Sequence, residues 1–506
     1  MQLRSRSVEH RPSREELRRY SEAQPNARIS EFGNVNLHTR ARARSKGSTL
    51  IVSDDPSHHT DPTLDRASYE ELAVRQDRYL EDQEVIVLDG FIGDHPDARM
   101  PTRLVVERTN ANLAAMQQLL YFPPEERFEP ELTVIYTPNL PAPGFPDDRL
   151  IAVDLEGGVT RVMNSDYFGE SKMGGLRMWD ATMYRRGGLA LHSGLKVIEI
   201  DGQRRVGLIV GLSGTGKTTT TFSKQGHSRP VQDDFVALFP GGRVYGTEAG
   251  TFAKVYGLTP ESEPTIWSGV TSSRTYLENV AQDDHGRLDF FDKHLTENSR
   301  AIIDARDLTD FLPPRQVERA DFLLLLNRNE NIIPSVARLD REQAAAYFML
   351  GETQGTSAGG AAEAGRFLRV PGTNPFFAYR HEWQANRLYE LLGTHPLEVY
   401  VLNTGRVGGP AGDDRSKKVS PEDSSSIVAA IAAGTIEWST DRDFGYQVAD
   451  RVPGVEDDEL LQPRRLYERQ GRLLEYRQAV EQLSADRRAH LARYPDLLPE
   501  IARSIS

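Results

Sequence analysis

A glycine-rich loop directly after a short apolar run constrains the fold of this chain more than any other feature. Residues 206–210 read Val-Gly-Leu-Ile-Val, which is typical of a buried strand, and Gly211–Thr218 then follows the pattern G-x-x-x-x-G-K-T. In this pattern the glycines let backbone N–H groups wrap around phosphate oxygens, and the helix that follows adds partial positive charge. The sequence therefore predicts a strand, a phosphate-binding loop and a helix over Thr219–Lys224.

Two side chains of the loop have tasks of their own. Lys217 reaches the outer phosphates of a nucleotide, and the Thr218 hydroxyl can bind Mg²⁺. Sixteen residues after Lys217, Asp233 and Asp234 begin a hydrophobic segment, and paired acids after such a loop commonly hold the metal or its waters. Taken alone, an Asp-Asp pair is more often a solvated turn.

The composition narrows the class of protein. The 506 residues include 61 Lys and Arg against 74 Asp and Glu, a net charge of −13, and the chain has no cysteine. The acidic total argues against a general nucleic-acid binder, and the lack of cysteine excludes disulfides, cysteine zinc sites and thiol nucleophiles. No apolar run approaches the ~20 residues that span a bilayer, and the Arg-rich N-terminus does not read as a secretory signal. We expect a cytoplasmic protein that binds neither a membrane nor a nucleic acid.

Lysine is rare, since only nine of the 61 basic residues are lysines. Positions that keep lysine either need a compact ammonium ion or are scattered at random by codon bias. Lys172 follows Gly169-Glu170-Ser171, and His192 ends a stretch of small residues. On residue chemistry alone, both side chains are more often structural than functional.

The pattern divides the chain into two regions. Up to about residue 190 it is mixed α/β, with a short polar helix within residues 1–30, strands at 49–52, 84–88, 103–106 and 132–136, and a helix at 112–120. The second region opens with a hairpin of 195–200 and 205–210 around Asp201-Gly202, followed by strands at 235–239, 322–326 and 399–402. Small residues at 355–365 indicate a loop, and a helix is expected over 468–494.

Several motifs occur together in a recognisable order. They are the loop Gly211–Thr219 with its Asp pair, Glu248–Lys254, Glu263-Pro264, Thr296–Arg300 and Asn403-Thr404-Gly405. In this combination the sequence resembles the ATP-dependent phosphoenolpyruvate carboxykinases over most of its length. The GTP-dependent branch carries a cysteine in its phosphate loop, where this chain has Ser213. The resemblance implies conversion of oxaloacetate and ATP to phosphoenolpyruvate, CO2 and ADP, a step of gluconeogenesis.

The resemblance also implies a bilobal α/β fold with the active site in the cleft between two domains. Residues 1–190 would form the N-terminal substrate-side domain, and residues 191–506 the P-loop nucleotide-binding domain with a helical tail from about 453. The implied cofactors are ATP, Mg²⁺ and Mn²⁺, and the implied partner is the small molecule oxaloacetate. We expect a monomer.

The resemblance assigns tasks to single residues. Arg44 would grip the substrate carboxylate, Tyr167 would lie by the CO2 and substrate pocket, and Arg300 would lie near the substrate and the γ-phosphate. The implied catalytic set is Arg44, Tyr167, Lys172, Ser213, Lys254 and Arg300, and the implied metal set is Lys172, His192, Thr218 and Asp234. The implied nucleotide set is Gly211, Leu212, Ser213, Gly214, Thr215, Gly216, Lys217, Thr218, Thr219, Asp233, Lys418, Val419 and Ser424. Without the resemblance, Arg44 is one of an Arg-rich run, Tyr167 a core aromatic and Arg300 a surface ion pair.

Three departures from the family pattern keep alternatives open. Family members have two adjacent lysines, one of them a metal ligand, where this chain has Lys172 and Met173. Either Met173 stands at the ligand position or Lys172 serves alone, and methionine is a poor ligand for a hard cation. The Arg44 segment lacks the family's Pro-Lys-Asp, and Lys418 stands where arginine is more usual. The alternatives are a kinase on the same scaffold with another acid as acceptor, and a non-catalytic nucleotide-binding regulator.

Overall fold

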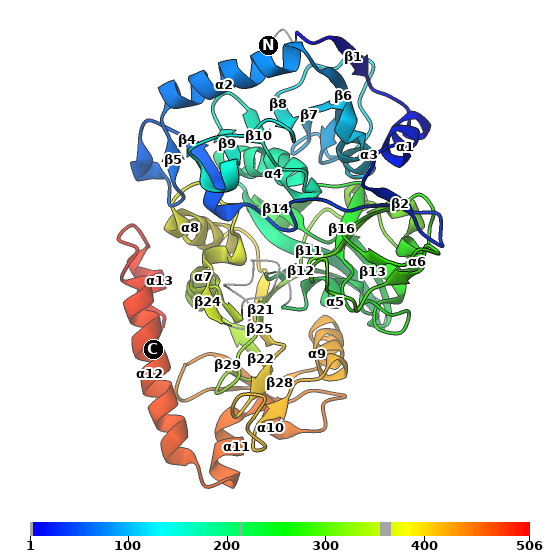
Figure 1. Ribbon diagram of the computed structural model, residues 1–506. Coiled ribbons are helices and arrows are strands. Elements are labelled where there is room, and N and C mark those ends of the chain that lie inside the picture. The colour runs from blue at the N-terminus through cyan, green and yellow to red at the C-terminus, as the bar shows by residue number, and fades with distance from the viewer. Residues whose placement is uncertain (1–3, 213–214, 355–365, 506) are drawn as a thin grey trace.

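The computed structural model describes residues 4–212, 215–354 and 366–505, which form a mixed α/β fold around three larger sheets (Figure 1). The prediction of an α/β protein is confirmed. The loop predicted at 355–365 lies outside the described residues, as do Ser213 and Gly214 of the phosphate loop. No helix in the described ranges is long and apolar enough to cross a membrane.

An eight-stranded sheet occupies the N-terminal part of the chain, in the order β1-β6-β7-β8-β10-β9-β4-β5. Its strands are β1 (Ser7–His10), β4 (Thr49–Val52), β5 (Thr63–Leu64), β6 (Glu84–Ile92), β7 (Met100–Glu107), β8 (Leu132–Thr137), β9 (Leu150–Asp154) and β10 (Val159–Met163). The helices of this part are α1 (Arg14–Glu22), α2 (Arg66–Glu81), α3 (Ala111–Leu120) and α4 (Phe168–Arg185).

Helices cover both faces of this sheet. Successive side chains of a strand point to opposite faces, so each strand contributes to two cores. In β6, Val85 and Val87 pack with Leu80 of α2. The intervening Ile86 and Leu88 belong to the larger core that contains α3 and α4. Helix α4 therefore lies beneath the sheet, toward the centre of the molecule (Figure 1), and its first turn reaches the site described below.

A ten-stranded sheet follows, in the order β15-β14-β11-β12-β21-β25-β22-β29-β28, with β13 paired to β11. Its strands are β11 (Leu189–Ile200), β12 (Gln203–Val210), β13 (His227–Gln232), β14 (Phe235–Phe239), β15 (Arg243–Gly246), β21 (Phe322–Asn327), β22 (Val336–Leu339), β25 (Glu398–Asn403), β28 (Glu437–Thr440) and β29 (Gln447–Arg451). The predicted hairpin is confirmed: β11 and β12 pair antiparallel around Asp201 and Gly202, whose φ angles are 50° and 76°. Two positive φ angles are what the Asp-Gly turn of a tight hairpin requires.

A five-stranded sheet, in the order β16-β20-β17-β3-β2, joins segments that are far apart in the sequence. Its strands are β2 (Ala27–Ile29), β3 (Val35–Leu37), β16 (Gly250–Lys254), β17 (Tyr276–Glu278) and β20 (Arg300–Asp304). Three two-stranded sheets complete the set: β18 (Ala281–Gln282) with β19 (Leu288–Asp289), β23 (Glu352–Gln354) with β24 (Phe367–Arg369), and β26 (Arg406–Val407) with β27 (Lys417–Lys418). The five-stranded sheet places residues 27–37 beside residues from the second half of the chain.

The remaining helices are α5 (Lys217–Phe222), α6 (Pro264–Val270), α7 (Arg341–Leu350), α8 (His381–Leu392), α9 (Pro421–Ala433), α10 (Asp458–Leu461), α11 (Pro463–Arg469), α12 (Leu473–Leu491) and α13 (Pro499–Arg503). The prediction of a single helix over 468–494 is wrong. Gly471 has a φ of 69°, which interrupts the helix between α11 and α12. Arg487 of α12 is fully buried and pairs with Glu352 at 2.6 Å and with the Tyr347 hydroxyl of α7 at 2.9 Å. These contacts hold α12 against α7 (Figure 1).

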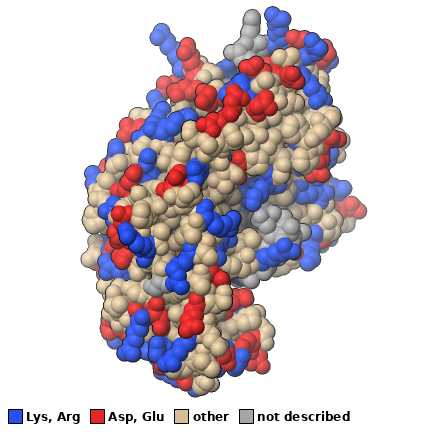
Figure 2. Space-filling view, turned by 90° about the vertical axis from the view of Figure 1, so that its left-hand side faces the viewer, with Lys and Arg blue, Asp and Glu red and all other residues tan. Residues whose placement is uncertain are grey.

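Basic and acidic side chains are interspersed over the face shown in Figure 2. Exposed ion pairs also occur in the molecule, such as Arg287 with Asp283 at 3.2 Å. Pairs of this kind contribute little to stability.

Candidate active site

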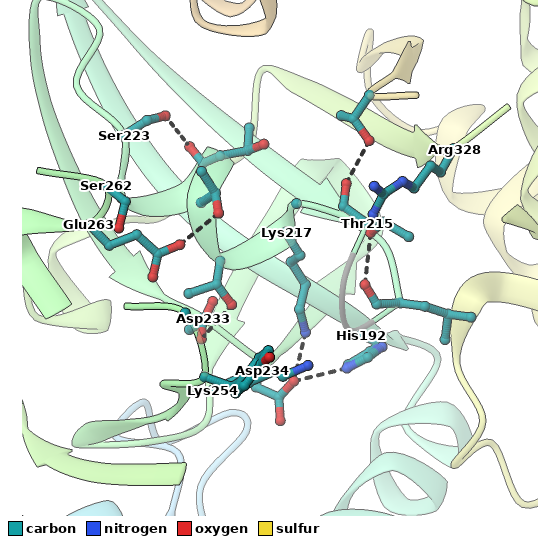
Figure 3. A pocket seen from close by; sticks show the side chains of 18 of the residues that line it. His192, Thr215, Lys217, Ser223, Asp233, Asp234, Lys254, Ser262, Glu263 and Arg328 are labelled. Carbon is teal, nitrogen blue, oxygen red and sulfur yellow. Dashed lines mark hydrogen bonds and ion pairs between the residues drawn. The ribbon is translucent and has the colours of Figure 1, made fainter. Parts of the chain in front are cut away.

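A cavity of about 550 Å³ gathers most of the residues that the sequence predicts for the site (Figure 3). The predicted residues that line it are Arg44, Tyr167, His192, Leu212, Thr215, Gly216, Lys217, Thr218, Thr219, Asp233, Asp234, Lys254, Arg300, Lys418, Val419 and Ser424. Among the described residues of the predicted set, Gly211 and Lys172 do not line it, and Lys172 is buried against Asp234. Ser213 and Gly214 lie outside the described residues.

Strand β12 leads the phosphate loop into this cavity. Gly216 has a φ of 96°, a left-handed conformation that favours glycine, and α5 begins at the next residue, Lys217. The helix therefore starts two residues before the predicted range, and it ends at Phe222 because Ser223 is extended. The Thr404 hydroxyl donates to the Thr215 carbonyl at 2.8 Å and ties the loop to the turn after β25, which lies two strands away from β12 in the sheet.

Asp234 is the centre of a buried cluster of charges. Its Oδ1 accepts from Lys217 Nζ at 2.7 Å, its Oδ2 accepts from Lys172 Nζ at 2.7 Å, and His192 Nε2 lies 2.9 Å from Oδ1. Burial opposes ionisation of this carboxyl, but the two ammonium groups outweigh it and hold the pKa of Asp234 well below its usual value. The carboxylate is therefore charged and central to the site.

His192 faces this carboxylate as a neutral imidazole. Burial and the nearby Lys217 ammonium lower the pKa of His192 to about 4. Its Nδ1 lies 3.0 Å from the Thr373 carbonyl oxygen, which can only accept, so Nδ1 carries the proton. The lone pair of Nε2 and the oxygen of Asp234 are then two acceptors that face the same space, an arrangement that suits a divalent cation.

Lys172 and Met173 take different places around this cluster. The Lys172 side chain is 1% exposed and bridges Asp234 at 2.7 Å and Glu248 at 3.1 Å, whereas Met173 lines the cavity. Although burial opposes the charge of Lys172, the two carboxyl groups raise its pKa. The pKa of Glu248 is itself raised to about 7 by burial. Lys172 is thus an ammonium ion that balances buried acids.

Asp233 points to a different part of the cavity, beside the phosphate loop. Its Oδ2 accepts from the hydroxyls of Thr218 at 3.3 Å and Thr251 at 3.4 Å. Its Oδ1 is buried and has no hydrogen-bond partner among the described residues. A buried oxygen without a partner is costly, so this atom is available to a metal ion or to water on one. Across the described ranges there is no cluster of three or more His, Asp or Glu side chains arranged to hold a metal.

A second group of residues lines another part of the cavity, which we call the acid end: Arg44, Tyr167 and Arg300. Asn298 links two of them, because its Nδ2 donates to the Tyr167 hydroxyl at 3.1 Å and its Oδ1 accepts from Arg300 Nη2 at 2.7 Å. The guanidinium of Arg44 lies over the ring of Phe376, 4.7 Å from its centre. Two guanidinium groups and a phenol thus line one region, a chemistry that suits a dicarboxylate.

Two buried carboxyl groups at the start of α4 hold the loop that carries Arg44. Asp166 accepts from the backbone N–H groups of Arg40 and Ala41, both at 2.9 Å. Glu170, which is fully buried, accepts from the N–H of Ser45 at 2.7 Å. The loop is therefore fixed on both sides of Arg44 by acids that flank Tyr167 in sequence.

The cavity also contains residues that the sequence analysis missed, among them Arg328, Phe376 and Gln225. One signal for Arg328 was available, because it lies two residues after the predicted strand 322–326. The parallel neighbour of that strand leads into the phosphate loop. Phe376 had no such signal. It meets His192, with 5.8 Å between ring centres, and Arg44 only through the fold.

Proteins of one family are similar to this chain over most of its length. The family model for phosphoenolpyruvate carboxykinase matches residues 6–458. A protein of Brevibacillus brevis named phosphoenolpyruvate carboxykinase (ATP) is 32% identical over 459 residues, 86% of this chain and 85% of its own length. Proteins of the same name from Aeropyrum pernix (31% over 413 residues, 79% of each chain) and Alkaliphilus oremlandii (27% over 521 residues, 99% and 96%) are also similar. The chain belongs to the ATP-dependent phosphoenolpyruvate carboxykinase family.

Proposed function

We propose that this chain converts oxaloacetate and ATP to phosphoenolpyruvate, CO2 and ADP. The observation that carries the proposal is that one cavity is lined by the phosphate loop, by Asp234, which pairs with Lys217 of that loop, and by Arg44, Tyr167 and Arg300. The names of the similar proteins and the family match support it. A cavity that holds only a nucleotide has no need of two arginines and a tyrosine at its far end.

The residues divide the reaction between them. Arg44 and Arg300 bind the carboxylates of oxaloacetate, and loss of CO2 leaves the electron pair of the broken C–C bond on the carbonyl oxygen as an enolate. The enolate oxygen attacks the γ-phosphorus of ATP, the bond to the bridging oxygen breaks, and ADP leaves. Lys217 stabilises the charge on the β- and γ-phosphates. Lys254, which lines the cavity, would add a cation near the same phosphates.

The donor atoms fit two metal sites. We assign Mn²⁺ to His192 and Asp234, whose facing acceptor atoms need a cation between them, and Mg²⁺ to Thr218, with its water oriented by Asp233. A bound divalent cation supplies stabilisation of the enolate oxygen. Lys172 was predicted as a ligand, but as an ammonium between Asp234 and Glu248 we assign it the role of a balancing cation.

The nucleotide would extend from the phosphate loop toward the start of α9. Lys418, Val419 and Ser424 line this part of the cavity, and we propose them for the adenosine side. We also propose the division into a substrate-side domain (1–190) and a nucleotide-binding domain (191–506, with the helical tail from about 453), with the cavity as the cleft between two lobes. Strands β2 and β3 would then cross from the first domain into a sheet of the second. The monomeric state and the cytoplasmic location stay predictions.

A coupled assay tests the function. The purified chain is mixed with ATP, Mg²⁺ and Mn²⁺, and formation of ADP, CO2 and phosphoenolpyruvate is followed with and without oxaloacetate. We expect all three products in equal amounts and only with oxaloacetate. Phosphoryl transfer to another acid without CO2 would favour the alternative kinase, and ATP binding without any turnover would favour the regulator.

A further inference from the structure

A basic residue outside the predicted set, Arg328, lines the cavity together with the phosphate loop. We call the part of the cavity at this loop the phosphate end. Arg328 follows β21 by one residue, and β21 lies parallel to β12, which leads into the phosphate loop. The carboxyl ends of parallel neighbours share one edge of a sheet, where ligands of such sheets usually bind. Arg328 and Thr215 follow the carboxyl ends of these two strands, and both line the cavity.

The backbone that carries Arg328 is fixed on both sides. The Asn327 carbonyl accepts from Thr404 N–H at 2.9 Å, and Asn329 N–H donates to the Asn403 side chain at 3.0 Å. Asn327 and Asn329 are each 5% exposed, whereas Arg328 is exposed and lines the cavity. A residue mounted in this way loses little backbone freedom when it binds a ligand.

The side chain of Arg328 extends toward the phosphate loop. In Figure 3 it reaches toward Thr215, and Glu263 lies on the other side of Lys217. Because Thr404 hydrogen-bonds both the Asn327 carbonyl and the Thr215 carbonyl, the loop and the turn of Arg328 are held together. A phosphate bound by Lys217 would therefore have a second cation within the same wall of the cavity.

The charges around the cavity also favour an anion at this place. Among the described residues that line it, six are basic and three are acidic. The basic residues are Arg44, Lys217, Lys254, Arg300, Arg328 and Lys418, and the acidic ones are Asp233, Asp234 and Glu263. Asp234 is already balanced by Lys172 and Lys217. The lining therefore carries more basic than acidic side chains, which favours an anionic ligand.

We propose that Arg328 is a further phosphate-binding residue, which contacts the terminal phosphates of the nucleotide beside Lys217. A planar guanidinium can donate two parallel hydrogen bonds to a phosphate, which a single ammonium cannot do. The inference rests on the proposed use of ATP. It predicts that the contribution of Arg328 grows with the number of phosphates on the nucleotide.

The test is a series of binding measurements on the full chain. Isothermal titration calorimetry with Mg²⁺ and AMP, ADP or ATP compares the wild type with Arg328→Gln and Arg328→Lys. For Arg328→Gln we expect the affinity for ATP to fall about tenfold or more, that for ADP to fall less, and that for AMP to stay within twofold. Arg328→Lys should recover part of the loss, since it keeps the charge without the two-pronged geometry.

Arg338→Gln is the matched control, because Arg338 lies on β22, is exposed and pairs with Glu398 at 3.0 Å outside the cavity. It should bind all three nucleotides as the wild type does. Equal weakening of AMP, ADP and ATP by Arg328→Gln would overturn the inference, because it would indicate a structural role. Unchanged ATP binding by this variant would overturn it as well, while leaving the proposed function intact. A wild type that binds none of the three would overturn both.

Discussion

The phosphate end of the cavity comes mainly from one loop between β12 and α5, whereas the acid end comes from three segments that are distant in sequence. At the phosphate end, the positive φ of Gly216 and the start of α5 present consecutive residues to the cavity. At the acid end, Arg44, Tyr167 and Arg300 are single side chains on separate elements. The first end depends on local backbone conformation, and the second depends on how the chain folds around it.

The acid end accordingly needs supports that the phosphate end does not. Asp166 and Glu170 hold the Arg44 loop, and Asn298 joins Tyr167 to Arg300. These three residues are buried, and their hydrogen bonds fix the positions of the side chains that line the acid end. Changes at the phosphate end should therefore affect chemistry directly, and changes behind the acid end should affect substrate binding first.

The largest effect is expected for Lys217→Ala. Loss of the cation on the β- and γ-phosphates should lower the rate of phosphoryl transfer by about 10³-fold or more, measured as ADP formation in the coupled assay. The fold should survive, because Asp234 keeps the Lys172 ammonium as a partner at 2.7 Å. Lys224→Ala is the control. Lys224 lies two residues after the end of α5, is exposed and pairs with Asp310. A Lys217→Ala variant with full activity would contradict the phosphate-loop assignment.

Lys172→Met should lower both the stability and the activity, because Lys172 balances two buried acids, one of which is Asp234 of the site. Removing the ammonium leaves Asp234 and Glu248 buried without their shared cation, and breaking a buried pair costs about 3–5 kcal/mol. We expect this loss in urea unfolding, together with loss of CO2 release and of phosphoryl transfer. The double variant Lys172→Met, Glu248→Gln should regain part of the stability but none of the activity. Wild-type rates in either variant would mean that the lysine is incidental.

Asp166→Ala tests the supports of the acid end. It removes the acceptor of two backbone N–H groups that position the Arg44 loop, each worth about 1–3 kcal/mol when left buried without a partner. The KM for oxaloacetate should rise about tenfold or more, while the KM for ATP stays within twofold. Asp166→Asn keeps one acceptor oxygen and should show a smaller rise. The control is Glu156→Ala, whose side chain is 88% exposed on the turn after β9. Parallel changes in both KM values would show that the two ends are not independent.

The same difference explains how far the sequence could predict the site. The motif at Gly211–Thr219 predicts the strand, loop and helix because their conformation is local, and the helix lies two residues earlier than predicted, at Lys217–Phe222. The acid end was assigned through a family resemblance, since nothing in the residues around Arg44 indicates that Asp166 pairs with its loop. That contact joins segments about 125 residues apart.

Two features of the fold escaped the sequence for physical reasons. Strand β1 (Ser7–His10) pairs in parallel with β6, but its residues are partly exposed and lack an apolar alternation, so the pattern predicted only a short polar helix within residues 1–30. The helix over 468–494 was predicted as continuous, although Gly471 within it takes a positive φ and divides it. Strand β1 forms only through its pairing with β6, whereas the break at Gly471 is local.

The smallest effect on catalysis is expected for Asp180→Asn, since Asp180 does not line the cavity, and this variant tests the wall behind the acid end through stability. Asp180 is fully buried in α4 and accepts from Asn374 Nδ2 at 3.0 Å. The neighbouring Thr373 carbonyl accepts from His192, and Phe376 packs on Arg44. Burial raises the pKa of Asp180 from 3.8 to about 8, so at pH 6 the carboxyl is neutral in the folded chain and ionised in the unfolded chain.

A raised pKa of an acid in the folded state stabilises the fold fully only below the unfolded pKa, and the benefit is lost as the pH rises toward the folded pKa. The free energy of unfolding of the wild type should therefore fall between pH 4 and pH 8 through this group, by up to about 1.4 kcal/mol per pH unit. Asparagine keeps the acceptor for Asn374 and does not titrate. The stability of Asp180→Asn relative to the wild type should then rise by up to about 3 kcal/mol between pH 5 and pH 7, measured by urea unfolding. Asp284→Asn, on an exposed turn, should show no such rise, and a constant difference for Asp180→Asn would mean that Asp180 is ionised within the wall.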